Sequence, residues 1–205
     1  MNTKQKILDA ALELFSTFGY DGVSVAQIGE AVGIKAPSLY KHFKSKQEIF
    51  ETIQNLMQER YNKQALKLHI ENKSDGGGDV FAKITEEQLI QMVLQLFRFF
   101  LLDAYMEKFR RMMILEQYRN PQIGALYRKQ YFDDPIRYQT ALFRQLMAAG
   151  VLREEDPKTA AVTFYSPIFL QLLLCDQHPE RIPEAEICIK NHIRHFGACY
   201  RKGNV

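Results

Sequence analysis

Hydrophobic side chains recur every three or four positions along most of the chain, which is the spacing of helices with one apolar face. Gly19 follows the first such stretch and is a natural helix stop, because glycine accepts the left-handed conformation found just beyond a helix. No segment alternates as a strand would. The pattern predicts an all-α protein of about nine helices, the first of which carries the apolar stripe Ile7, Leu8, Ala11, Leu14, Phe15 and Phe18.

Capping signals place the next two helices. Ser24 with Gln27 is the pattern of a capping box, so we expect a helix over residues 25–32. Gly33 then ends this helix. Pro37 is suited to the first turn of a short third helix, where the missing N–H costs nothing.

The remaining boundaries come from similar signals. Ser45 with Glu48 predicts the start of a long fourth helix that runs to about residue 70. The glycine-rich stretch NKSDGGGD, residues 72–79, predicts a mobile loop. Further helices are expected over about 85–104, about 105–118, 121–150 with a bend or break near Pro135, 156–176 with a kink at Pro167, and about 184–201.

Composition narrows the function classes. The 205 residues suffice for one large or two small domains, and a net charge of +3 means that any basic surface is local. Three cysteines make a disulfide framework improbable and fit a reducing cytoplasm. We expect no signal peptide, because Lys4, Lys6 and Asp9 interrupt the start of the chain. We expect no membrane span, because polar residues interrupt the apolar run 89–106 and the run 164–175 is too short.

The local basic segment is GIKAPSLYKHFKSKQ, residues 33–47, with four lysines. Three short helices with tight turns describe a helix-turn-helix, whose second member enters the major groove of DNA. Leu39 and Phe43 are four residues apart and would face inward, while the lysines neutralise phosphates. A solvated lysine-rich face is the alternative for the charge run taken alone.

These motifs resemble the DNA-binding domain of TetR-type bacterial transcriptional regulators over residues 7–50, about the first quarter of the chain. The run LYxHFxxK is its most specific part. The rest of the chain agrees only as a helical remainder of suitable length. The matching residues are Ile7-Leu8, Ala10-Ala11, Leu14-Phe15, Gly19-Tyr20, Ser24-Val25, Ile28, Gly33-Ile34, Leu39-Tyr40, His42-Phe43 and Lys46.

The resemblance implies a DNA-binding domain over 1–48 and an effector-binding and dimerisation domain over 49–205. The chain departs from the family pattern at Gly29, where alanine is usual, and at Lys35, where serine or threonine usually caps the helix. The resemblance assigns DNA contacts to Ser24, Lys35, Ala36, Pro37, Ser38, Tyr40, Lys41, His42 and Lys46.

Two stripes at helical spacing on the last helix predict a wide buried face. They are Cys188, His192, His195 and Cys199, and beside them Ile189, Ile193, Phe196 and Tyr200. The resemblance implies that the last two helices pair with their copies in a homodimer. A zinc site on the Cys-His-His-Cys stripe is disfavoured, because its ends lie eleven residues, about 16 Å, apart on one helix. We therefore predict no metal and assign the dimer interface to Tyr165, Ile168, Leu172, Cys188, His192, His195, Phe196 and Cys199.

The family design also implies an effector pocket between the fourth helix and those that follow. Abundant methionine and phenylalanine in the middle helices favour an apolar or aromatic effector, although such stripes are more often core. The glutamine-rich face of the helix over 85–104 is either solvated or lines a cavity. The candidate pocket residues are Tyr61, Gln91, Gln95, Arg98, Tyr105, Met113 and Tyr118.

An enzyme is the weaker class. No histidine has Glu three residues before it, as di-iron bundles need, and no GxSxG, HExxH or Walker pattern occurs. The sequence thus predicts no catalytic residue and no cofactor. It favours a ligand-responsive regulator, most often a repressor in the resembling family, that binds a palindromic operator as a homodimer. The alternative is a helical protein-binding adaptor.

Overall fold

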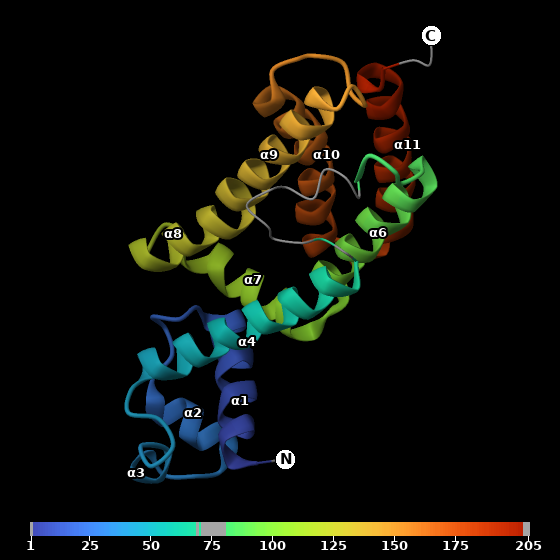
Figure 1. Cartoon of the computed structure of the whole chain (residues 1–205). Helices are drawn as coiled ribbons and strands as arrows, with labels where there is room; N and C mark the ends of the chain where they lie inside the picture. Colours follow the sequence, from blue (N-terminus) through green and yellow to red (C-terminus); the bar gives the residue numbers. More distant parts are fainter. Residues whose placement is uncertain (1, 69, 71–80, 203–205) are drawn as a thin grey trace. The chain divides into compact units, whose positions relative to one another are not determined.

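The computed structural model describes residues 2–68, 70 and 81–202. These residues form helices and no strand, with one isolated bridge between Leu152 and Arg201. The all-α class, with an N-terminal helix-turn-helix and a helical C-terminal part, is confirmed. The loop predicted at 72–79 lies outside the described residues. The helices (Figure 1) are α1 (Thr3–Phe18), α2 (Val25–Val32), α3 (Ala36–Leu39), α4 (Lys46–Lys67), α6 (Glu86–Leu102), α7 (Ala104–Glu116), α8 (Pro121–Arg128), the π-helix η1 (Lys129–Asp133), α9 (Asp134–Ala148), α10 (Pro157–Gln177), the 3-10 helix η2 (Pro179–Arg181) and α11 (Ile182–Tyr200).

The chain divides into two compact units. Unit 1 comprises Met1–Lys63 and Asp103–Lys129, and unit 2 comprises Gln64–Leu102 and Gln130–Val205. The division expected from the resemblance, after residue 48, concerns function rather than compactness. It stays a prediction.

Unit 1 is built around α1, which packs against α2 and α7. The core includes the fully buried side chains Phe15, Ile28 and Leu39. On its polar edge, Lys108 of α7 forms an ion pair with Glu13 of α1 at 2.5 Å. These contacts hold α1 between the helix-turn-helix and α7.

Unit 2 is built around α10, which packs against α9, α11 and α6. Three aromatic rings from α9, α10 and α11 meet there, those of Phe143, Phe164 and Phe196, with centroids 5.0–5.7 Å apart. Arg98 of α6 donates two hydrogen bonds to the Glu186 carboxylate of α11, at 2.5 and 2.6 Å. Aromatic packing inside and a bidentate ion pair outside therefore join these helices.

The break predicted near Pro135 is confirmed as a short π-helix, Lys129–Asp133. Proline lacks an N–H, so Pro135 cannot donate to the carbonyl of Tyr131, four residues earlier. The hydroxyl of Tyr165, on α10, donates to that carbonyl at 2.9 Å. A side chain from another helix thus supplies a hydrogen bond that a regular helix would draw from its own backbone.

By length and composition, α10 could cross a membrane. The apolar run 164–175 looked too short for this, but the helix begins at Pro157 and extends it to 21 residues. A third of the apolar window is buried inside the structure. Its buried residues include Phe164, Leu172 and Cys175.

Candidate nucleic-acid interface

The helix-turn-helix forms as its capping signals predict. The Ser24 hydroxyl accepts from the Gln27 N–H, and the Gln27 side chain accepts from the Ser24 N–H at 2.8 Å, which completes the capping box of α2. Gly33 ends α2 in the left-handed region, with a φ of 75°. A side chain would strain this position, so glycine sets the turn into α3.

The structure gives a reason for glycine at position 29, where the family usually has alanine. A Cβ placed on Gly29 would lie 2.8 Å from the carbonyl oxygen of Ile34. The Ile34 N–H also donates to the Gly29 carbonyl at 2.9 Å. The missing side chain lets α2 approach the following turn closely, which offsets the usual cost of a glycine inside a helix.

The short helix α3 is anchored from beneath and open above. Leu39 is fully buried and Phe43 is 1 % exposed, so both face the core as predicted. The Lys35 side chain makes no cap hydrogen bond, which leaves its charge available. Of the predicted DNA contacts on and around α3, Lys35, Pro37, Tyr40 and Lys41 are exposed, and Ala36, Ser38 and His42 are half-buried. The structure thus brings together a cationic, hydroxyl-bearing surface.

Lys46 stands apart from the other predicted DNA contacts. Its ammonium donates to the carbonyls of Tyr20 and Val23, each at 2.8 Å, and lies 4.3 Å from the centre of the Tyr20 ring. Two of its three N–H groups are therefore bound within the protein. Sequence reasoning missed this internal role, because the partners are backbone atoms far away along the chain.

Tyr20 completes this anchor. Its hydroxyl is 3.0 Å from the Gln47 side-chain oxygen and donates to it. Burial raises the pKa of the Tyr20 phenol, and the negative charges of Asp21 and Glu51 raise it further. The hydroxyl therefore stays protonated and remains a hydrogen-bond donor at neutral pH.

The seven predicted effector residues do not gather at one place within either unit. Gln91 and Gln95 line a hollow of about 380 Å³ in unit 2, together with Lys67, Leu68, Phe81, Ile84, Glu87, Gln88 and Met92. Arg98 is engaged by Glu186 instead. The glutamine-rich face of α6 is thus exposed to solvent and also lines a hollow. These are the two alternatives that the sequence left open.

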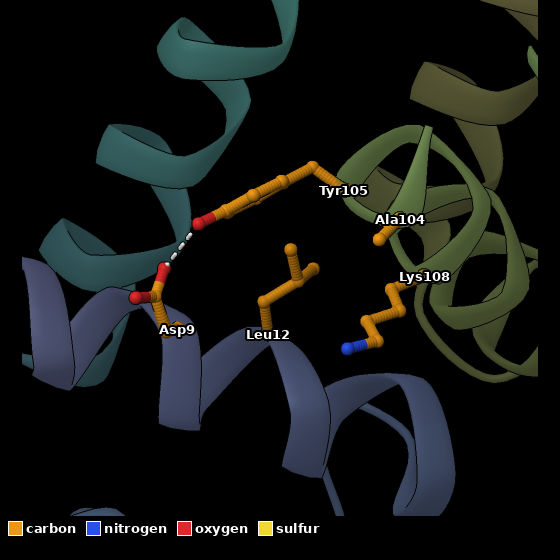
Figure 2. A pocket seen from close by; sticks show the side chains of 5 residues that line it. All are labelled: Asp9, Leu12, Ala104, Tyr105 and Lys108. Carbon is orange, nitrogen blue, oxygen red and sulfur yellow. Dashed lines mark hydrogen bonds between the residues drawn. The ribbon is translucent and has the colours of Figure 1, made fainter. Parts of the chain in front are cut away.

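The other candidates lie in unit 1. Tyr105 borders a smaller hollow of about 120 Å³ between α1 and α7 (Figure 2), where its hydroxyl donates to Asp9 at 2.8 Å. The hydrogen bond to Asp9, together with burial and the Asp9 charge, raises the pKa of Tyr105. Met113 is fully buried, whereas Tyr118 is 93 % exposed and Tyr61 is half-buried. Their assignment to an effector stays a prediction.

Asp103 and Arg60, which sequence reasoning did not single out, meet beside this hollow. Arg60 of α4 donates to both Asp103 oxygens, at 3.3 and 2.6 Å, and lies over the Tyr105 ring at 4.5 Å. Burial raises the pKa of Asp103, but hydrogen bonds from Arg60 and from the N–H groups of Met106 and Tyr105 outweigh it, so the pKa lies below its ordinary value. The available signal was the pattern of an N-cap before α7.

The predicted dimer residues divide between core and surface. Leu172 and Phe196 are each 6 % exposed and belong to the core of unit 2. Cys188, His195 and Cys199 are exposed, and Tyr165, Ile168 and His192 are half-buried. Three large apolar side chains on the same two helices are exposed as well, namely Val162, Leu170 and Ile187.

Histidine and cysteine side chains on α11 make only pairwise contacts. The His192 Nε2 lies 2.9 Å from the Phe164 carbonyl, and the Cys199 sulfur lies 3.6 Å from His195 Nε2. Across residues 2–68, 70 and 81–202, no group of three or more His, Cys, Asp or Glu side chains has the geometry to hold a metal.

Two family models match this chain. Residues 7–53 match the model of bacterial regulatory proteins of the tetR family. Residues 87–202, more than half of the chain, match the C-terminal domain of AefR-like transcriptional repressors. The two matches cover the helix-turn-helix and the helices from α6 to α11.

Among curated relatives, the match is local. IcaR, the negative transcriptional regulator of the biofilm operon icaADBC in Staphylococcus aureus (strain Newman), is 52 % identical over 48 residues, 23 % of this chain and 26 % of IcaR. The IcaR of Staphylococcus epidermidis is 49 % identical over 47 residues. The chain thus matches about a quarter of the length of these relatives.

Solved structures resemble the whole chain. A structure of a putative TetR-family regulator from Mesorhizobium loti covers 98 % of this chain and 97 % of its own, with a TM-score of 0.66 and 22 % identity. The SmeT–triclosan complex covers 100 % and 94 %, with a TM-score of 0.67 and 21 % identity. At these identities the likeness concerns the fold alone.

Proposed function

The chain belongs to the tetR family of bacterial regulatory proteins, and on this premise we propose that it is a transcriptional repressor that binds a palindromic operator as a homodimer and is released by a small effector. The observation that carries the proposal is the surface around α3, where lysine and hydroxyl side chains are exposed above two buried anchors. IcaR is a negative transcriptional regulator, which supports repression.

The surface suggests how DNA would be held. Lysines at 35 and 41 approach phosphates or guanine edges, while Tyr40, His42 and Ser24 donate to backbone oxygens. Ala36, Pro37 and Ser38 keep the helix slim enough to enter the major groove. The third N–H of Lys46 is left for a phosphate.

The small size of α3 supports the homodimer in this proposal. One recognition helix of four residues offers few contacts, so two copies are needed for a specific site. The exposed apolar side chains of α10 and α11, with Cys188, His195 and Cys199, are the proposed dimer surface. The proposed location is the cytoplasm, where the chromosome is, and no catalytic activity is proposed.

The effector site is proposed at the hollow of unit 2. Gln91 and Gln95 offer amide groups beside the apolar side chains of Leu68, Ile84 and Met92. This lining suits an apolar or aromatic molecule with a few hydrogen-bonding groups. SmeT is solved with triclosan, which makes that aromatic compound a reasonable first probe in a thermal-shift panel.

The proposal is tested by selection from random duplex DNA with the full chain, followed by titration of the recovered duplex across salt. We expect a palindromic duplex and a steep decline of affinity with salt. Lys41→Ala should weaken binding, and Lys83→Ala, which changes an exposed lysine of unit 2, is the matched control. No enriched duplex, or equal binding by both variants, would favour the protein-binding adaptor.

A further inference from the structure

Residues 19–23 form the turn that leads from α1 into α2, and side chains of opposite charge hold it from two helices. Lys46 of α4 donates to two of its carbonyls, at 2.8 Å each. Glu116 of α7 accepts from the Asp21 N–H at 3.3 Å. We propose that Glu116 is a positioning residue for DNA binding, which fixes this turn and thereby the start of α2. The proposal rests on the proposed function.

The carboxylate of Glu116 lies close to the backbone of the turn. Gly19 has a φ of 78°, and a Cβ placed there would overlap with the Oε1 atom of Glu116. The carboxylate therefore occupies the space that a side chain would fill. Glycine is required here both for its backbone angle and for this contact.

Keeping Glu116 in this position costs stability. Its side chain is 1 % exposed, and its Oε2 atom has no hydrogen-bond partner among the described residues. A buried polar atom without a partner destabilises the folded state. An apolar side chain of similar length would fill the space without that cost. Local costs of this kind are expected where a residue serves function rather than folding.

Asn120, the N-cap of α8, contacts the turn at a second point. The Asn120 side-chain amide donates to the Asp21 carboxylate at 3.4 Å, and the Asn120 N–H donates to the Glu116 carbonyl at 2.9 Å. One contact from the end of α7 and one from the start of α8 thus connect to Asp21, three residues before the Ser24 cap of α2. A displacement of this end of α7 withdraws the acceptor from the turn and loosens the start of α2.

The test compares three variants of the full chain on the duplex recovered by selection. Glu116→Gln keeps an acceptor at the same reach, Glu116→Asp shortens the reach, and Glu116→Met removes the acceptor at similar length. We expect the Gln variant to bind within about twofold of wild type, and the Asp and Met variants to bind about tenfold more weakly. The salt slope should stay unchanged in all three, because no phosphate contact is lost.

A purely structural role predicts a different result. If Glu116 only stabilised the fold, the Met variant would lose thermal stability along with affinity. Under the proposal its melting midpoint is unchanged or higher, since the variant removes a buried oxygen without a partner. Lys41→Ala is the comparator for phosphate contacts, with a salt slope reduced by about one.

Three outcomes would overturn the proposal: wild-type affinity in the Met variant, a loss of affinity with a shallower salt slope, or a loss that tracks a lower melting midpoint. A wild type that enriches no duplex overturns the proposed function instead.

Hydrogen exchange at the Asp21 amide tests the contact itself. Faster exchange in the Met than in the Gln variant supports the hold on the turn, and equal rates refute it.

Discussion

The helix-turn-helix of unit 1 and the α10–α11 pair of unit 2 use apolar side chains in different ways. The recognition helix α3 buries only Leu39, and its other three side chains are small and exposed or half-buried. The exposed lysines Lys35 and Lys41 lie on either side of it. The pair α10–α11 buries rings such as Phe164 and Phe196 and still exposes Val162, Leu170 and Ile187. The first region has a polar surface above the buried side chains of Leu39 and Phe43. The second has apolar side chains both in its core and on its surface.

This difference separates two kinds of partner. A surface of lysines and hydroxyls suits a hydrated polyanion, whose contacts weaken with salt. Exposed apolar side chains beside a packed core suit a partner that excludes water, such as a second copy of the same helices. Mutations in the two regions should therefore differ in what they change.

The largest effect is expected inside α11. Phe196→Ala should lower the free energy of unfolding by about 3–5 kcal/mol, because it removes a ring packed between two others. Ile187→Ala, on the 58 % exposed side, should barely change folding at low protein concentration but weaken association. Urea unfolding at several protein concentrations checks both. If both changes lowered the free energy of unfolding equally, the distinction between a core face and an association face of α11 would be wrong.

The next effect concerns the polar surface. Lys35→Ala combined with Lys41→Ala should reduce the slope of log affinity against log salt by about two, because two phosphate contacts are removed. Unfolding should not change, since both lysines are exposed. Titration of the selected duplex at several salt concentrations measures the slope, with Lys83→Ala as control. An unchanged slope would assign these lysines to solvent.

A smaller effect is expected at the π-helix. Tyr165→Phe removes the donor to the Tyr131 carbonyl and should destabilise unit 2 by about 1–2 kcal/mol. Thermal unfolding measures the loss, and Tyr138→Phe, a change of another half-buried tyrosine of the same unit, is a comparison variant. A silent Tyr165→Phe change would mean that water serves the carbonyl equally well.

The smallest effect depends on pH. The pKa of Asp103 is lower in the folded chain than in the unfolded one, so its carboxylate contributes stability above about pH 4, the unfolded value, and the contribution is lost as pH falls through the folded pKa. Arg60 is 40 % exposed, so solvent screens the pair. Asp103→Asn keeps an N-cap but not the charge.

Unfolding of wild type and Asp103→Asn should therefore be compared at pH 7 and pH 3. We expect wild type to be the more stable at pH 7, and the difference between the two proteins to shrink at pH 3. A difference that is independent of pH would show that the charge of Asp103 is not what stabilises this site.

Local signals predicted the backbone of the helix-turn-helix well. These signals act between residues that are close in sequence, so the residue types themselves determine the local structure. Examples are the Ser24–Gln27 capping box, the helix end at Gly33 and the inward side chains of Leu39 and Phe43. Side chains that act over long separations were not predictable in this way. Lys46 turns toward carbonyls more than twenty residues away, and nothing near it in the sequence indicates this.

The stripes of α11 show the same limit. Periodicity indicated that Phe196 and Cys199 lie on apolar or mixed faces, but a helix with two such faces does not say which one packs inside its own unit. The structure places Phe196 in the core and Cys199 at the surface. Choosing between the faces requires α9 and α10, whose positions the sequence of α11 cannot specify.

The hydrogen bond between Tyr165 and the Tyr131 carbonyl links two positions 34 residues apart in the chain. Its need arises from Pro135, which has no N–H to give. Across homologues, proline at 135 should therefore be inherited together with a hydroxyl-bearing residue at 165. Lineages that have lost the proline are free to replace the tyrosine by phenylalanine. This pair of positions should be visible as covariation in an alignment of close relatives.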